Sequence, residues 1–220
     1  YWESPLNARW VEASLCLFRE FADRGGRYFL GVGTCAEYDW SSGYCSETAT
    51  PLNPDTLYGV SKHCLNRILR RLAPGVGVDF AWGRLFFIYG PREKPSRLIP
   101  TLIQAGLKSR PFPAVNQTQV RDFLYVEDAA SALAKLVKSE VPGEFNIASG
   151  HGIKLKNLTA LIREKLGLPP ESAPASGDGG EEDTSAVVAD INRLRKETGW
   201  IPSYELSAGL DQTVKWWREQ

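Results

Sequence analysis

The chain has 220 residues, 43% of them apolar, so it is long enough to bury a substantial hydrophobic core. Its 26 basic side chains equal its 26 acidic ones, which argues against a nucleic acid or an anionic membrane surface as partner. Four cysteines without a Cys-x-x-Cys pair and two histidines argue against a zinc site, and no apolar run approaches the roughly eighteen residues of a membrane span, so the composition predicts a soluble cytoplasmic protein.

The first predicted element is a helix that begins at Pro5. Ser4 is a typical N-cap, proline is favoured in the first turn, and apolar side chains recur at helical spacing as far as Asp23, just before Gly25 and Gly26. The apolar side chains cover more than one face of this helix. It is therefore expected to pack against a sheet and also against another helix or a second subunit.

A strand, a long loop, a second helix and a second strand follow. Asp55 is the predicted N-cap of the second helix, which carries Tyr58 and Lys62. The spacing of strand, helix and strand is typical of a parallel sheet with crossover helices. The predicted bounds are 27–32 for the first strand, which ends before Gly33, then 34–54 for the loop, 55–73 for the helix and 78–87 for the second strand.

The second half of the chain is less regular and predicts a mixed α+β region. Residues 169–184 are rich in Pro, Gly, Ser and acidic side chains, a composition that predicts disorder. The predicted helices span residues 98–107, 127–138, 156–166, 192–198 and 207–219, and the extended segments span 120–124 and 144–147.

Tyr58 and Lys62 form a candidate catalytic pair. Side chains four residues apart on a helix are neighbours, with Cβ atoms about 5–6 Å apart. A nearby cation lowers the pKa of a phenol from its ordinary value of about 10 by roughly 1–3 units, so that Tyr58 could exchange a proton with a substrate hydroxyl. One such pair can arise by chance among eight tyrosines, but the first strand delivers the Thr34 hydroxyl to the same place.

Short segments spread over most of the chain resemble those of one enzyme family. In the family's order they are residues 33–38 (GTCAEY), 58–62 (YGVSK), 83–92 (GRLFFIYGPR), 121–128 (RDFLYVED), 145–148 (FNIA) and 209–216 (GLDQTVKW). On these segments the chain resembles the extended short-chain dehydrogenases, the NAD-dependent epimerase/dehydratase family.

The resemblance implies an NAD- or NADP-dependent epimerase or reductase whose small-molecule substrate is a sugar or nucleotide sugar. Tyr58 would be the general acid/base, Lys62 would bind the nicotinamide ribose and lower the pKa of Tyr58, and Thr34 would hydrogen-bond the reacting oxygen of the substrate. The segment that would pass beside the nicotinamide consists of Phe86, Phe87 and Ile88.

Three further side chains are candidate substrate ligands, each with a structural alternative. Asn7 resembles a position where the family often keeps a polar active-site residue, but a surface or capping role is equally open. Arg92 is either an anion ligand or a solvated loop residue. Arg121 can fork onto two phosphate oxygens, or it can form a salt bridge with its neighbour Asp122.

The sequence departs from the family's pattern at several positions. It has no Gly-x-x-Gly-x-x-Gly loop, which would cradle a pyrophosphate, and no Met, so we expect the chain to be part of a longer protein. Cys35 and Ala36 stand where the family's sugar-nucleotide dehydratases have an Asp-Glu pair, so 4,6-dehydration is expected to be disfavoured and Cys35 to be a small buried filler. Phe87 stands where nucleotide-sugar enzymes usually have Asn, which weakens the case for a nucleotide sugar.

The expected fold class is α/β, with a doubly wound, Rossmann-like parallel sheet that is incomplete at its N-terminal side. Residues 1–90, with 120–150 returning in part, would form the C-terminal half of a dinucleotide-binding domain, and residues 91–220 mainly a smaller mixed α+β substrate-binding region. The resemblance to the family also implies a homodimer. The alternative function is a non-catalytic or truncated relative that serves as a binding or regulatory module, against which the intact set of Thr34, Tyr58 and Lys62 argues.

Overall fold

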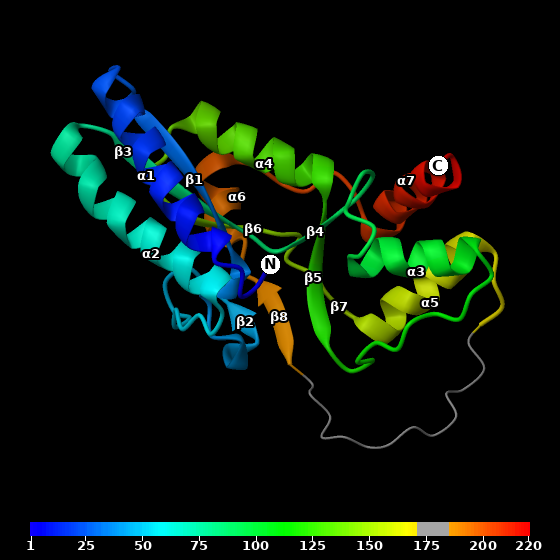
Figure 1. Ribbon diagram of the computed structural model, residues 1–220. Helices are drawn as coiled ribbons and strands as arrows, with labels where there is room; N and C mark the ends of the chain where they lie inside the picture. Colours follow the sequence, from blue (N-terminus) through cyan, green and yellow to red (C-terminus); the bar gives the residue numbers. More distant parts are fainter. Residues whose placement is uncertain (171–184) are drawn as a thin grey trace.

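The computed structural model describes residues 1–170 and 185–220 (Figure 1). Most of the segment predicted to be disordered lies outside these residues. The helices are α1 (Leu6–Asp23), α2 (Leu57–Leu72), α3 (Leu98–Leu107), α4 (Val126–Ser139), α5 (Leu155–Leu166), α6 (Asn192–Thr198) and α7 (Leu206–Arg218), with 3-10 turns η1 (Cys35–Glu37), η2 (Trp40–Ser42) and η3 (Ala73–Val76). The strands are β1 (Tyr28–Thr34), β2 (Tyr44–Cys45), β3 (Asp79–Leu85), β4 (Phe87–Tyr89), β5 (Val120–Tyr125), β6 (Gly143–Ile147), β7 (Gly152–Lys154) and β8 (Ala186–Ala189).

Parallel strands form the centre of the fold. β1, β3 and β6 lie in that order in one sheet, and the register pairs Thr34 with Leu85 and Leu85 with Ile147. The C-terminal ends of the three strands therefore meet at one edge of the sheet. A second group of strands follows the order β2-β8-β5-β4, with β7 antiparallel to β5. The predicted α/β class with a parallel, Rossmann-like sheet is confirmed.

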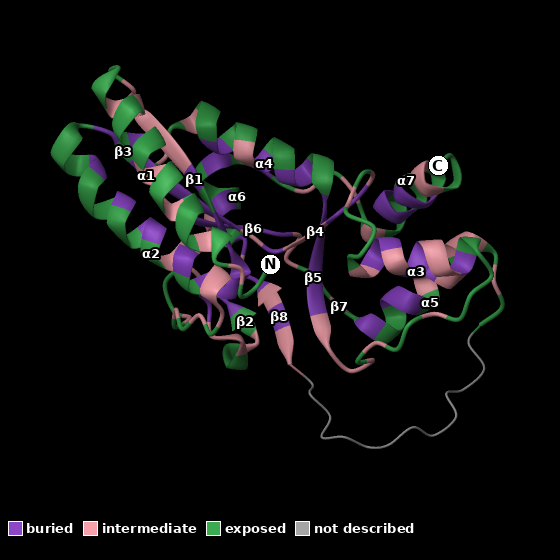
Figure 2. Ribbon diagram, viewed as in Figure 1, coloured by how far each residue is buried: buried purple, intermediate pink, exposed green. Residues whose placement is uncertain are grey.

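Helices cover both faces of the first sheet. α1 and α2 pack on one face, where Phe18 and Leu69 contact the aromatic side chains Phe80 and Trp82 of β3. α4 and α6 cover the other face, and their side chains surround Phe145 of β6. Figure 2 shows the buried residues on the sheet side of these helices and exposed residues on the outer side. In the part of the chain that the structure describes, no helix has the length and apolar character needed to cross a membrane.

The second half packs around its own core. α3, α5 and α7 enclose Tyr89 of β4 and Tyr125 of β5, and buried leucine and isoleucine side chains such as Leu102, Leu158 and Leu210 fill the space between them. This arrangement agrees with the mixed α+β region predicted for the second half. The two cores adjoin along β4 and β5, so residues from both halves of the chain reach the same edge of the strands.

Several predicted boundaries were wrong, each for a local physical reason. The strand predicted at 78–87 is two strands, because Phe86 leaves the ladder of β3 and donates its N–H to Ile147 O, after which β4 pairs with β5. Thr56, not Asp55, caps α2, since its hydroxyl accepts the Gly59 N–H at 3.1 Å. The strands β2, β7 and β8 were not predicted, because segments of two to four residues have no periodicity to recognise.

Candidate active site

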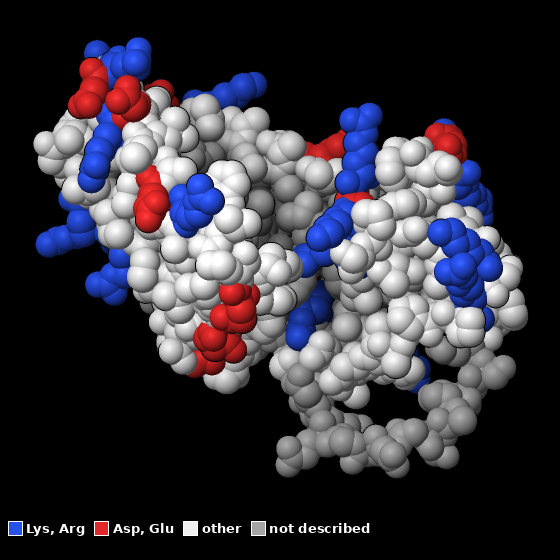
Figure 3. Space-filling view, in the orientation of Figure 1, with Lys and Arg blue, Asp and Glu red and all other residues white. Residues whose placement is uncertain are grey.

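A cavity of about 940 Å³ lies at the C-terminal ends of β1, β3 and β4. Figure 3 shows the surface hollowed near the middle of the molecule, with Lys and Arg side chains beside the hollow. This is the edge at which open α/β sheets bind their ligands. All the predicted site residues except Asn7 line this cavity, namely Thr34, Tyr58, Lys62, Phe86, Phe87, Ile88, Arg92 and Arg121.

Thr34 ends β1 and is held by hydrogen bonds on both its backbone and its side chain. Its backbone is extended, its hydroxyl accepts the Ala36 N–H at 3.3 Å, and its own N–H donates to Glu37 Oε1 at 3.0 Å. Together these bonds form a capping box for the turn η1. The Thr34 side chain also lowers the pKa of the Tyr58 phenol, and the two predicted hydroxyl groups line the same cavity wall.

Tyr58 lies in the first turn of α2. Its N–H donates to Trp2 O at 2.9 Å, and its ring makes edge contacts with the rings of Tyr1 and Trp2, with centroids 5.4 and 5.7 Å away. Burial raises the pKa of Tyr58 above its ordinary value, and the Thr34 side chain opposes this rise. In this cavity the phenol is therefore a proton donor and acceptor whose ionised form is disfavoured by desolvation.

Lys62 is one turn further along α2, and its ammonium donates to Val32 O at 2.9 Å. Burial lowers the pKa of Lys62, and the carboxylate of Glu37 opposes this effect. Burial of the phenol is the main influence on the pKa of Tyr58, and the Lys62 ammonium is directed at a backbone carbonyl of β1, so the predicted lowering of the Tyr58 pKa by Lys62 stays a prediction.

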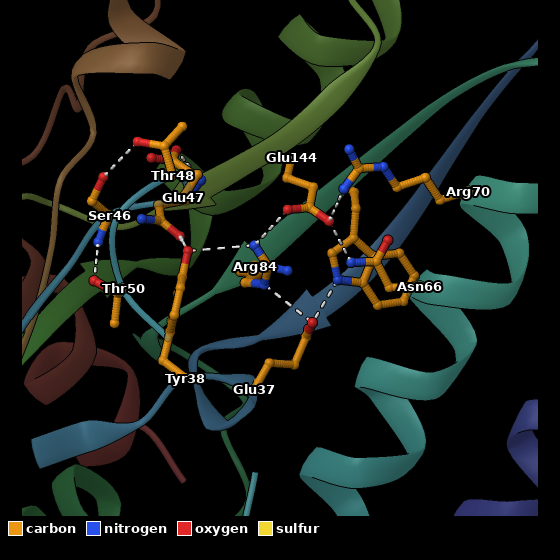
Figure 4. A network of polar contacts seen from close by, with 12 residues as sticks. Glu37, Tyr38, Ser46, Glu47, Thr48, Thr50, Asn66, Arg70, Arg84 and Glu144 are labelled. Atoms are coloured by element: carbon orange, nitrogen blue, oxygen red, sulfur yellow. Dashed lines mark hydrogen bonds and ion pairs between the residues drawn. The ribbon is translucent and has the colours of Figure 1, made fainter. Parts of the chain in front are cut away.

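A network of polar side chains lies behind Thr34 and was not predicted from the sequence (Figure 4). Its centre is an ion pair between Glu37 and Arg84, with Arg84 Nε 3.1 Å from Glu37 Oε2 and both side chains fully buried. The one sequence signal for it was the spacing Thr34-x-x-Glu37, which matches a capping box. The partner on β3 could not be recognised, because it depends on the register between β1 and β3.

The candidate substrate ligands differ in how firmly they are held. Arg121 is 7% exposed, and its Nη1 donates to Ser185 O at 2.7 Å and to Val120 O at 2.9 Å. Its guanidinium also lies over the rings of Trp40 and Phe87, at 5.5 and 5.7 Å from their centroids. Arg121 is thus a rigid cationic part of the cavity wall.

Asp122, Arg92 and Asn7 have different surroundings in the structure. Asp122 accepts the N–H groups of Ser149, Gly150 and Ala189, so its carboxylate links β5 to β8 and to the segment after β6. Arg92 is exposed on the cavity rim, with a left-handed backbone (φ 65°). Asn7 lies outside the main cavity, where its amide donates to Tyr1 O at 2.9 Å and lines a smaller cavity of about 280 Å³ between α1 and α2.

Cys35 and Glu93 are two cavity residues whose pKa is raised by burial. Cys35 is 4% exposed and burial raises the pKa of its thiol, which fits the predicted filler role. Glu93, which the sequence analysis missed, lines the cavity from the segment after β4, and burial raises its pKa to about 7 against the opposing influence of Arg97. Nothing local in the sequence marks Glu93 as a buried carboxyl.

Comparisons with known proteins agree with the fold. The model of the NAD dependent epimerase/dehydratase family matches residues 4–148. The dTDP-glucose 4,6-dehydratase of Neisseria gonorrhoeae is 32% identical over 195 residues, a match that covers 76% of this chain and 52% of the relative. The chain spans about half the length of the curated relatives it matches.

Solved structures show the same architecture. A UDP-N-acetylglucosamine 4-epimerase from Methanobrevibacter ruminantium, solved with UDP-N-acetylmuramic acid, is 25% identical with a TM-score of 0.83, over 95% of this chain and 68% of that one. A protein solved with UDP-glucuronic acid and NAD is 26% identical with a TM-score of 0.79, over 97% of this chain and 70% of that one.

The prediction of an epimerase or reductase in which 4,6-dehydration is disfavoured is contradicted by these comparisons, since the curated relatives named here are dTDP-glucose 4,6-dehydratases. The prediction considered only Cys35 and Ala36, the two residues that follow Thr34. The cavity draws a further carboxyl, that of Glu93, from a segment distant in sequence. Two local positions are too little to exclude a reaction that the whole cavity wall determines.

Proposed function

Because the chain belongs to the NAD-dependent epimerase/dehydratase family, we propose that it carries the catalytic pair and the substrate side of an enzyme that oxidises a hydroxyl of a nucleotide sugar. The observation that carries this proposal is that Thr34 and Tyr58 line the same cavity wall, with Lys62 one turn after Tyr58 on the same helix. In this step the O–H proton of the sugar passes to the Tyr58 phenolate while Thr34 holds the reacting oxygen. The nicotinamide, when bound, supplies the acceptor for the hydride that leaves the same carbon.

The residues at the strand ends fit the nicotinamide half of a dinucleotide. Tyr58 and Lys62 present hydroxyl and ammonium groups of the kind that bind ribose oxygens, and residues 86–88 form a flat apolar wall beside them. We assign NAD or NADP to this side of the cavity. As the sequence suggested, we also propose that residues 1–90 and part of 120–150 bind the cofactor. Residues 91–220 would mainly bind the substrate.

The charge of the cavity favours an anionic substrate. Four basic side chains line its substrate side, and Glu93 is the one carboxyl among the described residues of its lining. Guanidinium groups bind two phosphate oxygens at once, so a diphosphate is the chemical group that this lining would recognise. The basic residues are Arg92, Lys94, Arg97 and Arg121.

We propose that the protein forms a homodimer through the outer faces of α1 and α2. The two helices lie side by side (Figure 1), and each exposes an apolar stripe to solvent. On α1 the stripe includes Trp10, which is 69% exposed, and on α2 its members are eight and four residues apart, which keeps them on one face of the helix. Exposed apolar area of this kind marks an interface. The stripe residues are Leu6, Trp10 and Leu17 on α1 and Val60, Ile68 and Leu72 on α2.

The Tyr58→Phe substitution in the full chain tests the proposed chemistry. It removes the proton-transfer group while keeping the ring contacts, so turnover is expected to fall by roughly 10²–10⁴-fold with the fold intact. The assay mixes the protein and NAD with dTDP-glucose or UDP-glucuronic acid and follows the reduced nicotinamide in a single turnover. Tyr44→Phe, at a tyrosine 54% exposed and absent from the cavity lining, is the matched control. Full turnover by the Tyr58→Phe protein would contradict the proposal.

A further inference from the structure

Glu37 stands directly behind Thr34 and is fully buried, so it meets the reaction only through other residues. Its Oε1 accepts two hydrogen bonds, from the Thr34 N–H at 3.0 Å and from the Trp82 indole N–H at 2.9 Å. Gly33 leaves room for this pair, because a Cβ at that position would overlap both the indole nitrogen and Oε1. The carboxylate is thus locked against the end of β1.

We propose that Glu37 is a positioning residue for the proposed proton transfer, and that Arg84 holds it in place. The inference rests on the function proposed above for Thr34 and Tyr58. The Thr34 hydroxyl can meet the phenol only while the end of β1 keeps its orientation, and Glu37 fixes that end through the Thr34 N–H. Arg84 Nε binds the second carboxylate oxygen at 3.1 Å, which sets the direction of Oε1.

The same network reaches the helix that carries Tyr58 (Figure 4). Arg84 Nη1 lies 3.3 Å from Glu144 Oε2 on β6, and Glu144 Oε1 accepts the amide N–H of Asn66 at 2.8 Å. Asn66 lies on α2, two turns after Tyr58. The two elements that present Thr34 and Tyr58 are therefore joined to one buried guanidinium, so that a change at Arg84 is transmitted to both.

The energetics of a buried ion pair support a role beyond stability. Desolvation of two charges offsets much of their attraction, so apolar side chains of similar volume often stabilise a fold equally well. The pair of Glu37 and Arg84, with both side chains fully shielded from water, is therefore better explained by the geometry it imposes at Thr34 than by the free energy it contributes.

The charge of Glu37 gives the proposal a readout that a purely structural role lacks. Burial is the main cause of the raised pKa of Tyr58, and Glu37 raises it further, as do Tyr1 and Cys35. Lys62, one turn along α2, and Arg97 are basic groups that line the same cavity as the phenol. Removal of the Glu37 charge therefore lowers the pKa of Tyr58. Turnover that needs the phenolate would reach its plateau at a lower pH.

The test is Glu37→Gln in the full chain, with kcat, KM and the pH profile of single-turnover hydride transfer as readouts. The Gln amide oxygen can still accept the Thr34 and Trp82 N–H groups, but its NH₂ faces the Arg84 N–H groups, so the side chain loses its fixed direction. We expect kcat to fall at least tenfold, KM for the nucleotide sugar to change less than threefold, and the rising limb of the pH profile to move to lower pH.

Asp128→Asn is the matched control, because Asp128 is another buried carboxylate that accepts two backbone N–H groups, those of Ser203 and Tyr204, each at 2.9 Å, outside the network of Glu37 and Arg84. It should leave kcat and the pH limb unchanged. If Glu37→Gln does not fold, Arg84→Lys replaces it, since an ammonium keeps the charge but cannot reach Glu37 and Glu144 together; the same fall in kcat is expected.

A folded Glu37→Gln protein with kcat within twofold of the parent and an unmoved pH limb would overturn the inference. A folded, fully active Arg84→Lys protein would also overturn it. If Tyr58→Phe abolishes turnover in the same assay while Glu37→Gln does not affect it, the proposed function stands and only the positioning role fails. Unchanged turnover in both variants would remove both proposals.

Discussion

At the scale of single residues, Glu93 shows how packing changes the chemistry of a side chain. Its pKa rises from 4.5 to about 7 because burial disfavours the charged form, and Arg97, 3.7 Å away, only partly opposes this. The unfolded chain ionises this carboxyl near 4.5 and the folded chain near 7. Folding is therefore penalised progressively as the pH rises from about 4.5 to about 7, and below that range the penalty is absent.

We predict that Glu93→Gln stabilises the protein at pH 8 and leaves its stability unchanged at pH 4. The shift corresponds to at most about 3 kcal/mol, and the 18% exposure of the side chain reduces this to about 2 kcal/mol. Urea unfolding of both proteins at pH 4, 6 and 8 measures the effect. Glu12→Gln, on the exposed side of α1, is the control. A gain in stability that is the same at all three pH values would contradict the assignment.

At the scale of elements, local signals predicted the helices and the strands β1, β5 and β6 to within two residues, but they missed the short strands β2, β7 and β8 and the break between β3 and β4. α3 and α6 were predicted at their observed bounds, and the other helices to within one or two residues at each end, because caps and the helical period are encoded within a few residues. The break between β3 and β4 depends on which neighbour each strand pairs with. Pairing between distant segments, such as β2 with β8, leaves no local pattern.

The N-cap of α2 provides a test at this scale. Thr56 accepts the Gly59 N–H, whereas Asp55 was the cap predicted from the sequence. We expect Thr56→Ala to lower the free energy of unfolding by about 1 kcal/mol, and Asp55→Ala to change it by less than half as much. Thermal or urea unfolding of both variants measures the difference. A larger loss of stability for Asp55→Ala than for Thr56→Ala would contradict the Thr56 cap and favour Asp55 as the N-cap. Because Tyr58 is in the first turn of α2, Thr56→Ala should also reduce turnover.

At the scale of the whole molecule, the sequence pointed to candidate site residues where they carry a motif and missed those that the fold assembles. Thr34, Tyr58 and Lys62 belong to short patterns, and the structure brings them to one cavity. The Glu37–Arg84 pair was missed because its partners come from segments far apart in sequence, and Glu93 was missed because its burial leaves no local pattern. Such residues become visible only once the register of the sheet and the packing of the two halves are known.

The proposed dimer makes the last prediction, which concerns the outer faces of α1 and α2. Trp10 is the most exposed large apolar side chain of the described chain, and it lies in the middle of the stripe on α1. Aromatic anchors at the centre of an interface commonly contribute 2 kcal/mol or more, so Trp10→Glu should weaken association at least about 30-fold. Sedimentation velocity at micromolar concentration should show a dimer for the parent and a monomer for the variant. Val137→Glu, at a similarly exposed site on α4, should remain dimeric. A parent protein that sediments as a monomer would refute the interface, because both apolar stripes would then be exposed to water in solution.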